Sequence, residues 1–150
     1  MSKLSVGDKA PNFGSVNQNG EKVSLKDFEG NKLIVYFYPK DNTPGCTKQA
    51  CNLRDNYQSL LDNGYKLLGV SPDSEKSHQK FIEKFELPFD LLADTEHEVA
   101  EAFGVWVEKN MYGRKYMGIA RTTFVIDEKG VISEIISKVK TDNHTDQILN

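Results

Sequence analysis

Apolar positions along the chain fall into two strand-like runs. Residues 33–38 are an unbroken apolar stretch rich in β-branched and aromatic side chains, and residues 65–71 form a second, mostly apolar stretch. Segments that are apolar on both faces are typical of central strands covered on both sides. The pattern therefore predicts two buried strands near the middle of a sheet.

The segment between these strands has a helical period. Thr43 is a natural N-cap residue, Pro44 a natural first helical residue, and Asn63-Gly64 a natural stop. One helix is expected from residue 44 to about residue 62. Its apolar or small positions fit a single face: Cys46, Ala50, Leu53, Tyr57, Leu60 and Leu61.

Two further helices are expected after residues 72–74 and after Asp94 or Thr95. Their predicted inner faces are His78, Phe81, Ile82 and Phe85 in the first, and Val99, Ala102 and Phe103 in the second. We expect His78, on an apolar face, to be a core residue with its hydrogen bonds satisfied rather than an acid or base.

Turn signals predict two hairpins. Asn19-Gly20 lies between the two halves of residues 13–25, and residues 127–130 separate strands expected at 122–126 and 131–136. Residues 104–120 show no clear period and are expected to form a long loop with a satellite cluster of aromatic side chains. A short helix is expected near 143–149. Strands that alternate with helices predict one α/β domain over residues 1–150, with a central sheet flanked by helices.

Composition argues against a nucleic-acid-binding, membrane-spanning or exported protein. The 150 residues include 19 Lys+Arg and 22 Asp+Glu, a net charge of −3, which argues against nucleic-acid binding. No apolar run approaches the roughly 18 residues of a membrane span, and the N-terminal residues carry no apolar signal core, so a cytoplasmic protein is expected. Without a long exposed apolar stripe, we expect a monomer.

Metal binding is not expected. A zinc site needs about four ligands, and the histidines at positions 78, 97 and 144 all lie far from the cysteines in sequence. The two cysteines, Cys46 and Cys51, are close together instead. In a reducing compartment such a pair is more often catalytic, redox-active or metal-binding than a structural disulfide.

Cys46 has the strongest functional signal. It falls in the first turn of the predicted helix, just past the carboxyl end of a central strand, where open α/β sheets place their ligands. Free backbone N–H groups and the positive end of the helix dipole favour a thiolate there, and Lys40 and Lys48 add positive potential. The alternative is a small buried hydrophobic residue, but the second cysteine five residues later favours function.

Helix geometry separates the two cysteines. Five residues along an α-helix place the Cα atoms roughly 8.6 Å apart, whereas a disulfide tolerates no more than about 7 Å. Either both thiols stay reduced and unrelated, or the helix unwinds when they join.

The segment from Pro39 to Cys51 resembles the peroxiredoxin family. Pro39, Thr43 and Cys46 match the pattern P-x-x-x-T-x-x-C, and Thr-Pro-Gly-Cys-Thr with a cysteine five residues on resembles the bacterioferritin comigratory protein, or peroxiredoxin Q, branch. The similarity extends along nearly the whole chain, through residues 7–11, 36–41, 69–73, 103–106 and 121–127. It implies a thioredoxin-like fold with an N-terminal β-hairpin extension.

The resemblance also implies an activity and a set of roles. It implies a thiol peroxidase that reduces hydrogen peroxide and organic hydroperoxides, takes electrons from thioredoxin and needs no cofactor or metal. Cys46 would be the peroxidatic and Cys51 the resolving cysteine, Thr43 and Arg121 would hold and polarise the peroxide, and Pro39 would shield the pocket. At position 49 this sequence has Gln where many peroxiredoxins have a Glu that pairs with the arginine; Gln49 adds no charge to hold Arg121.

Two other functions remain open. A thiol–disulfide oxidoreductase on the same fold usually carries C-x-x-C, whereas the spacing here is C-x-x-x-x-C, and no proline precedes the strand at Thr122. A redox-sensing or chaperone-like module would use the aromatic segment 104–120. Peroxide consumption with thioredoxin, its reductase and NADPH would distinguish these three functions.

Overall fold

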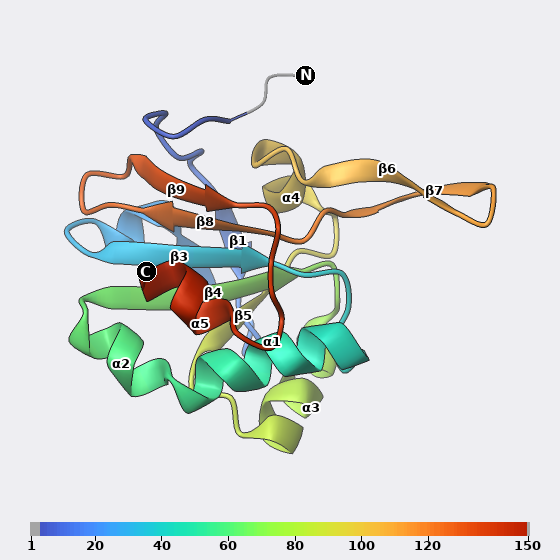
Figure 1. Cartoon of the computed structure of the whole chain (residues 1–150), viewed down its shortest axis with the longest axis horizontal. Helices are drawn as coiled ribbons and strands as arrows, with labels where there is room; N and C mark the ends of the chain where they lie inside the picture. The colour runs from blue at the N-terminus through green and yellow to red at the C-terminus, as the bar shows by residue number, and fades with distance from the viewer. Residues whose placement is uncertain (1–3, 150) are drawn as a thin grey trace.

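A five-stranded mixed sheet forms the centre of the protein (Figure 1). The computed structural model describes residues 4–149; residues 1–3 and 150, the ends of the expected domain, lie outside the described residues. The strand order is β5-β4-β3-β8-β9, with β3, β4 and β5 parallel and β8 and β9 antiparallel to their neighbours. The strands are β3 (Lys32–Phe37), β4 (Tyr65–Ser71), β5 (Asp90–Ala93), β8 (Thr122–Ile126) and β9 (Ile132–Ile136).

The unbroken apolar run fills β3 because both faces of this strand are buried. Leu33, Val35 and Phe37 point into one core, whereas Ile34 and Tyr36 point into the other. A period of two sends successive side chains to opposite faces, so a strand covered on both sides needs apolar residues throughout. The prediction of a doubly covered central strand is confirmed.

Helices cover the two faces unequally (Figure 1). The core that contains Tyr36 is closed by four helices: α1 (Pro44–Asp55), α2 (Tyr57–Asp62), α3 (Glu75–Phe85) and α5 (His144–Leu149). The other core is closed by α4 (Glu98–Ala102), together with Phe13 of the N-terminal segment. None of the helices between residues 4 and 149 is long and apolar enough to span a membrane.

Most predicted elements are present, with local corrections. The N-terminal hairpin consists of β1 (Gly14–Val16) and β2 (Lys22–Ser24), followed by a 3-10 helix (Leu25–Phe28). The single helix expected up to residue 62 is wrong, because it breaks at Asn56, whose side-chain amide donates to the carbonyl of Asn52 at 2.8 Å. Asparagine side chains compete for backbone groups in this way and interrupt helices.

The short helix α4 also differs from its expected inner face. Ala102 is exposed and Ala100 is buried instead. His97, not Asp94 or Thr95, is the residue before the helix, and it has a left-handed backbone. Asp94 nevertheless satisfies the helix start, because its carboxylate accepts hydrogen bonds from the N–H groups of Val99 and Ala100.

The long loop expected over residues 104–120 is wrong. This segment forms β6 (Trp106–Met111) and β7 (Arg114–Ile119), a two-stranded hairpin that projects away from the central sheet (Figure 1). Tyr112 and Gly113 make its turn with positive φ values of 54° and 83°. Most of its side chains are exposed on both faces, so no core-facing alternation marks the strands in the sequence.

Gly69 is required by the packing between β4 and the tyrosine on β3. A Cβ atom at this position would lie 2.6 Å from Leu91 Cδ2 and 2.9 Å from Tyr36 Cζ. We therefore expect Gly69→Ala to destabilise the protein by about 1–3 kcal/mol through overpacking. Gly14→Ala is the control, because a Cβ there meets nothing within 4 Å. Urea unfolding measures both, and a Gly69→Ala variant as stable as Gly14→Ala would contradict this packing.

Candidate active site

Cys46 lies at the third position of α1, immediately beyond the carboxyl end of β3. Its side chain is 2% exposed and belongs to the core between the sheet and α1. At this position the backbone N–H groups of the first helical turn have no intrahelical partners and the helix dipole is positive. The predicted placement of Cys46 at a helix start is confirmed.

Arg121 reaches Cys46 from the neighbouring strand. It precedes β8, whose first residue Thr122 pairs with Phe37, the last residue of β3. Its Nη2 donates a hydrogen bond to Cys46 Sγ at 3.2 Å. The contact places a cationic hydrogen-bond donor directly against the cysteine sulfur. The guanidinium also lies over Gly45, where a Cβ would be 3.3 Å from Nη2.

Gln49 holds the other side of the guanidinium. Arg121 Nη1 donates to Gln49 Oε1 at 2.6 Å, one helical turn beyond Cys46. The uncharged side chain therefore still makes the bond expected of an acidic residue. Gln49 is fully buried, and within residues 4–149 its Nε2 has no hydrogen-bond partner.

Thr43 and Pro39 lie in the segment that joins β3 to α1. Thr43 occupies the N-cap position, but its side chain does not cap the helix. Its hydroxyl instead donates to the carbonyl of Lys40 at 2.9 Å, so the hydroxyl oxygen is left as an acceptor toward other groups. Pro39 is half-buried at the start of this segment.

Cys51 is half-buried on the same unbroken helix as Cys46, and both thiols are free. The structure therefore brings together Cys46, Gln49 and Arg121 but leaves Cys51 apart, as helix geometry requires. The next residue, Asn52, ties the helix to the C-terminal segment. Its Oδ1 accepts from the N–H of Thr145 at 2.8 Å, and its Nδ2 donates to the carbonyl of Asp142 at 3.2 Å.

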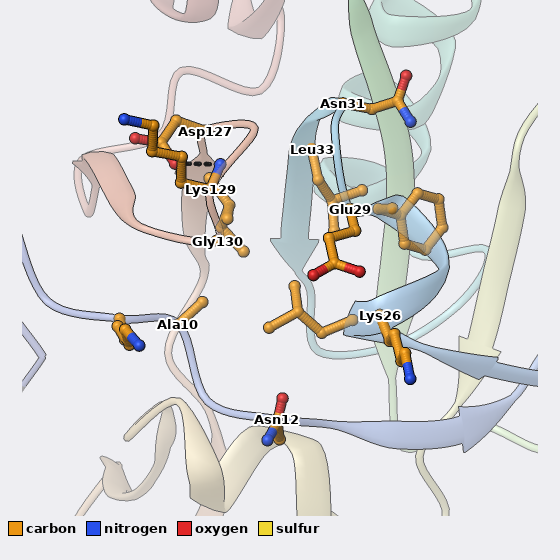
Figure 2. A pocket seen from close by; sticks show the side chains of 13 residues that line it. Ala10, Asn12, Lys26, Glu29, Asn31, Leu33, Asp127, Lys129 and Gly130 are labelled. Carbon is orange, nitrogen blue, oxygen red and sulfur yellow. Dashed lines mark hydrogen bonds between the residues drawn. The ribbon is translucent and has the colours of Figure 1, made fainter.

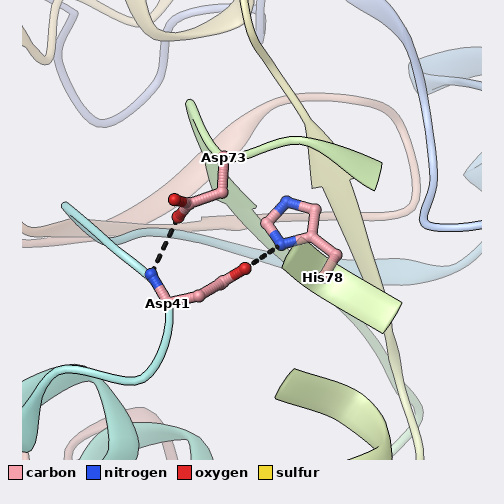
Figure 3. A group of neighbouring side chains, drawn as sticks. All are labelled: Asp41, Asp73 and His78. Atoms are coloured by element: carbon pink, nitrogen blue, oxygen red, sulfur yellow. Dashed lines mark hydrogen bonds and ion pairs between the residues drawn. The ribbon is translucent and has the colours of Figure 1, made fainter. Parts of the chain in front are cut away.

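A buried polar network anchors the segment between β3 and α1 (Figure 3). Asp41 accepts hydrogen bonds from the Tyr38 hydroxyl at 2.6 Å and from Ser77 at 2.8 Å, and its Oδ2 lies 2.7 Å from His78 Nδ1. The Nε2 of His78 faces the carbonyl of Leu92 at 2.8 Å. Both ring nitrogens of His78 therefore have a polar partner inside the core. His78 is a satisfied core residue, as predicted.

This network is the one cluster in the described chain with metal-ligand character, because Asp73 also approaches it. Asp73 Oδ2 accepts from the N–H of Asp41 at 2.8 Å and from the Ser71 hydroxyl at 2.7 Å. Each group already has a protein partner, so the cluster serves to fix the backbone before α1.

Lys109 is a neighbour of the site that no sequence pattern indicated. It lies on β6, and its side chain runs across Gly118, where a Cβ would be 3.3 Å from Lys109 Cδ. Burial and the Arg121 charge lower the pKa of Lys109, whereas Cys46 raises it. The hairpin thus brings another cation toward the cysteine. Recognition of the Tyr112-Gly113 turn in the sequence would have revealed this strand.

A separate pocket lies at the opposite end of the sheet (Figure 2). It is lined by Leu33 at the start of β3 and Ile126 at the end of β8, which pair in register, and by residues of the N-terminal segment. None of the predicted site residues contributes to it.

Comparison with known proteins agrees with this geometry. The sequence profile of the AhpC/TSA family matches residues 6–135. The chain is 52% identical to a putative peroxiredoxin bcp of Coxiella burnetii, over 97% of each chain, and 49% identical to peroxiredoxin Bcp of Escherichia coli, over 100% of this chain and 96% of the relative.

Solved structures are similar over most of their length. Peroxiredoxin Q of Xanthomonas campestris matches with a TM-score of 0.86 and 38% identity, over 91% of this chain and 87% of that one. A cysteine-to-serine mutant of PrxQ from Xylella fastidiosa matches with a TM-score of 0.92 and 33% identity, over 100% of this chain and 96% of that one. The thioredoxin-like fold expected from the resemblance is confirmed. The family profile, these relatives and the cysteine bonded to an arginine at a helix start all agree. The chain belongs to the AhpC/TSA family and is a peroxiredoxin, a thiol-dependent peroxidase.

Proposed function

We propose that this peroxiredoxin reduces hydrogen peroxide and organic hydroperoxides at Cys46, forms a Cys46–Cys51 disulfide and is recycled by thioredoxin. The observation that carries the proposal is the 3.2 Å hydrogen bond from Arg121 to Cys46 Sγ at the first turn of α1. The bacterioferritin comigratory protein of Xanthomonas campestris, whose solved structure is 37% identical to this chain, has alkyl peroxide reduction activity.

In the first step, the Cys46 thiolate attacks the terminal oxygen of the hydroperoxide. The S–O bond forms, the O–O bond breaks, and the leaving alkoxide or hydroxide takes a proton from water, which leaves a sulfenic acid. Arg121 and the free N–H groups of the first turn donate to the oxygens as negative charge develops. Thr43 acts as an acceptor for the peroxide O–H, because its own proton is bonded to Lys40.

In the second step, the Cys51 thiol condenses with the sulfenic acid, and the disulfide forms as water leaves. A thioredoxin dithiol then reduces the disulfide through a mixed intermediate. The helix must open between the two cysteines for the bond to form. The Asn52 bonds to Asp142 and Thr145 favour opening of the part that precedes them.

We place this cycle in the cytoplasm, where the redox poise keeps thiols reduced between turnovers. We also propose that the enzyme acts as a monomer, since Cys46, Arg121 and Cys51 all come from one chain. The competing function, thiol–disulfide exchange, requires a disulfide that opens and closes within the intact fold. Two cysteines five residues apart in one helix do not meet that requirement.

The two cysteines have separable roles. We expect Cys46→Ser to abolish peroxide consumption, because the attacking sulfur is lost. Cys51→Ser should consume about one peroxide per chain and then turn over poorly with thioredoxin, because its sulfenic acid has no internal partner. Peroxide consumption coupled to NADPH oxidation measures both. Full thioredoxin-linked turnover by Cys51→Ser would contradict the resolving role of Cys51.

Arg121 should act on the transition state as well as on the thiolate. We expect Arg121→Ala to slow peroxide attack by about 10²–10³-fold, the usual loss when one donor to a developing oxyanion is removed. Stopped-flow rates across a pH series, compared on the plateau where the thiolate is fully formed, isolate this effect. Arg114→Ala, an exposed arginine on β7, is the matched control for charge. Equal plateau rates for Arg121→Ala and wild type would show that Arg121 affects only ionisation.

Disulfide formation should unwind the start of α1. We expect the oxidised protein to lose about one to two helical turns, with faster amide exchange from Gly45 to Cys51 and retained protection after Asn52. Hydrogen exchange and circular dichroism on reduced and oxidised protein, with mass spectrometry of the bond, provide the measurement. An oxidised protein with the Cys46–Cys51 bond and an equally protected helix would refute this unwinding.

A further inference from the structure

Two buried polar atoms without hydrogen-bond partners in the described chain belong to α1 and to the core beneath it, and α1 is the helix that we propose to open. Across residues 4–149, three buried side-chain polar atoms lack a hydrogen-bond partner: the Tyr36 hydroxyl, Gln49 Nε2 and His97 Nδ1. Gln49 belongs to α1, and Tyr36 lies in the core that α1 covers, together with Cys46. Native proteins leave few such groups unsatisfied, so two at one helix form a distinctive feature of this fold.

Tyr36, the residue before the last of β3, projects into the core that α1 covers. Its ring lies across Gly69 of β4, with Cζ 2.9 Å from the place of a Cβ there, and meets the edge of Phe89 at 6.1 Å between centroids. Burial raises the pKa of Tyr36, and the next largest cause is the charge of Cys46, with a smaller effect from Cys51 on the same helix. This effect agrees with the packing, because Tyr36 and Cys46 belong to the same core beneath α1.

Tyr38 provides a comparison on the same strand. The two rings stack with centroids 5.4 Å apart, and both side chains are 1% exposed. The Tyr38 hydroxyl donates to Asp41 at 2.6 Å, whereas the Tyr36 hydroxyl has no partner within residues 4–149. The two residues differ mainly in whether the hydroxyl is satisfied.

An unpaired hydroxyl destabilises only the state that buries it. When α1 is packed, the Tyr36 hydroxyl is buried and has no protein partner within residues 4–149, so it carries a desolvation cost that no protein hydrogen bond offsets. When the first turns of α1 open, water and freed backbone carbonyls become available as partners. The free-energy gap between packed and open α1 is therefore smaller than it would be with phenylalanine at this position.

We propose that the Tyr36 hydroxyl, together with Gln49 Nε2, is a positioning element that keeps α1 poised to open and so speeds formation of the Cys46–Cys51 disulfide. The inference rests on the resolving role of Cys51 proposed above. Faster opening shortens the lifetime of the Cys46 sulfenic acid. A second peroxide can otherwise oxidise the sulfenate to sulfinate, transferring one oxygen to sulfur and releasing water or alcohol. Tyr36 thereby sets the peroxide concentration that the enzyme withstands.

The test compares Tyr36→Phe with Tyr38→Phe. In the reduced protein, Tyr36→Phe should lower the opening equilibrium of α1 about tenfold, equivalent to about 1.4 kcal/mol, seen as slower amide exchange from Gly45 to Cys51. Tyr38→Phe removes a satisfied bond to Asp41 and should leave this exchange equal or faster. Thermal unfolding should show a raised Tm for Tyr36→Phe and a lowered Tm for Tyr38→Phe.

The functional measurements follow the sulfenic acid. Tyr36→Phe should form it at the wild-type rate, convert it to the disulfide about tenfold more slowly, and reach half-conversion to sulfinic acid at about tenfold lower peroxide. Stopped-flow fluorescence of Trp106, the single tryptophan, and mass spectrometry of Cys46 give these values.

The outcomes separate this inference from the proposed function. Exchange in reduced Tyr36→Phe that is as fast as in wild type, or a lowered Tm, would overturn the inference, because the hydroxyl would then be satisfied in the packed state. Slower exchange with unchanged disulfide formation would overturn the link to resolution. Failure of the wild-type protein to form the Cys46–Cys51 bond would instead reject the proposed function, while the exchange in reduced protein would still show whether Tyr36 controls α1.

Discussion

The contact between Arg121 and Cys46 joins three elements and, in the proposed mechanism, defines the reactive state. It links the residue before β8 to the first turn of α1, across the end of β3. The same guanidinium holds Gln49 one turn further along the helix. Arg121 can therefore contact the sulfur only while α1 is packed on the sheet. In the proposed mechanism, the geometry that promotes peroxide attack is thus the geometry that keeps Cys46 and Cys51 apart.

This constraint divides α1 into two functional parts. The first part carries Cys46 and Gln49, and within residues 4–149 its side chains are hydrogen-bonded to the rest of the protein through Arg121 alone. The part from Asn52 onward is bonded to the C-terminal segment through Asp142 and Thr145. Before the helix, the Asp41–His78 pair fixes the backbone at the other side. The segment that we propose to unwind thus lies between two anchored positions, so that it can repack after each cycle.

The sequence was sufficient to predict the layers and the placement of Cys46 at a helix start, because burial on both faces and the Thr43-Pro44 helix start leave clear local patterns. Cys46 and the central strand β3 were found in this way. The site roles expected of Thr43 and Arg121 depended on family resemblance, since a helix cap and a lone arginine before a strand carry no signal for chemistry. The hairpin β6–β7 was missed because it is exposed on both faces, and the helix break at Asn56 because it depends on a side-chain bond to Asn52. The partners Asp41 and His78 are 37 positions apart, and only the folded chain brings them together.

The unpaired polar groups under α1 affect the same equilibrium between the packed and the open helix. A helix packed by apolar contacts alone, through Ala50 and Leu53, would favour the attack geometry and make opening rare. The Tyr36 hydroxyl and the Gln49 Nε2 group, which are buried without protein partners within residues 4–149, act in the opposite direction, because their desolvation cost is relieved only when the helix opens. By this inference, the packed state of α1 is less stable than it could be, and the disulfide forms faster as a result. Such a relation is common where catalysis needs local unfolding. By this inference, a mutation that made packed α1 more stable would prolong the lifetime of the Cys46 sulfenic acid. The enzyme would then be inactivated at a lower peroxide concentration.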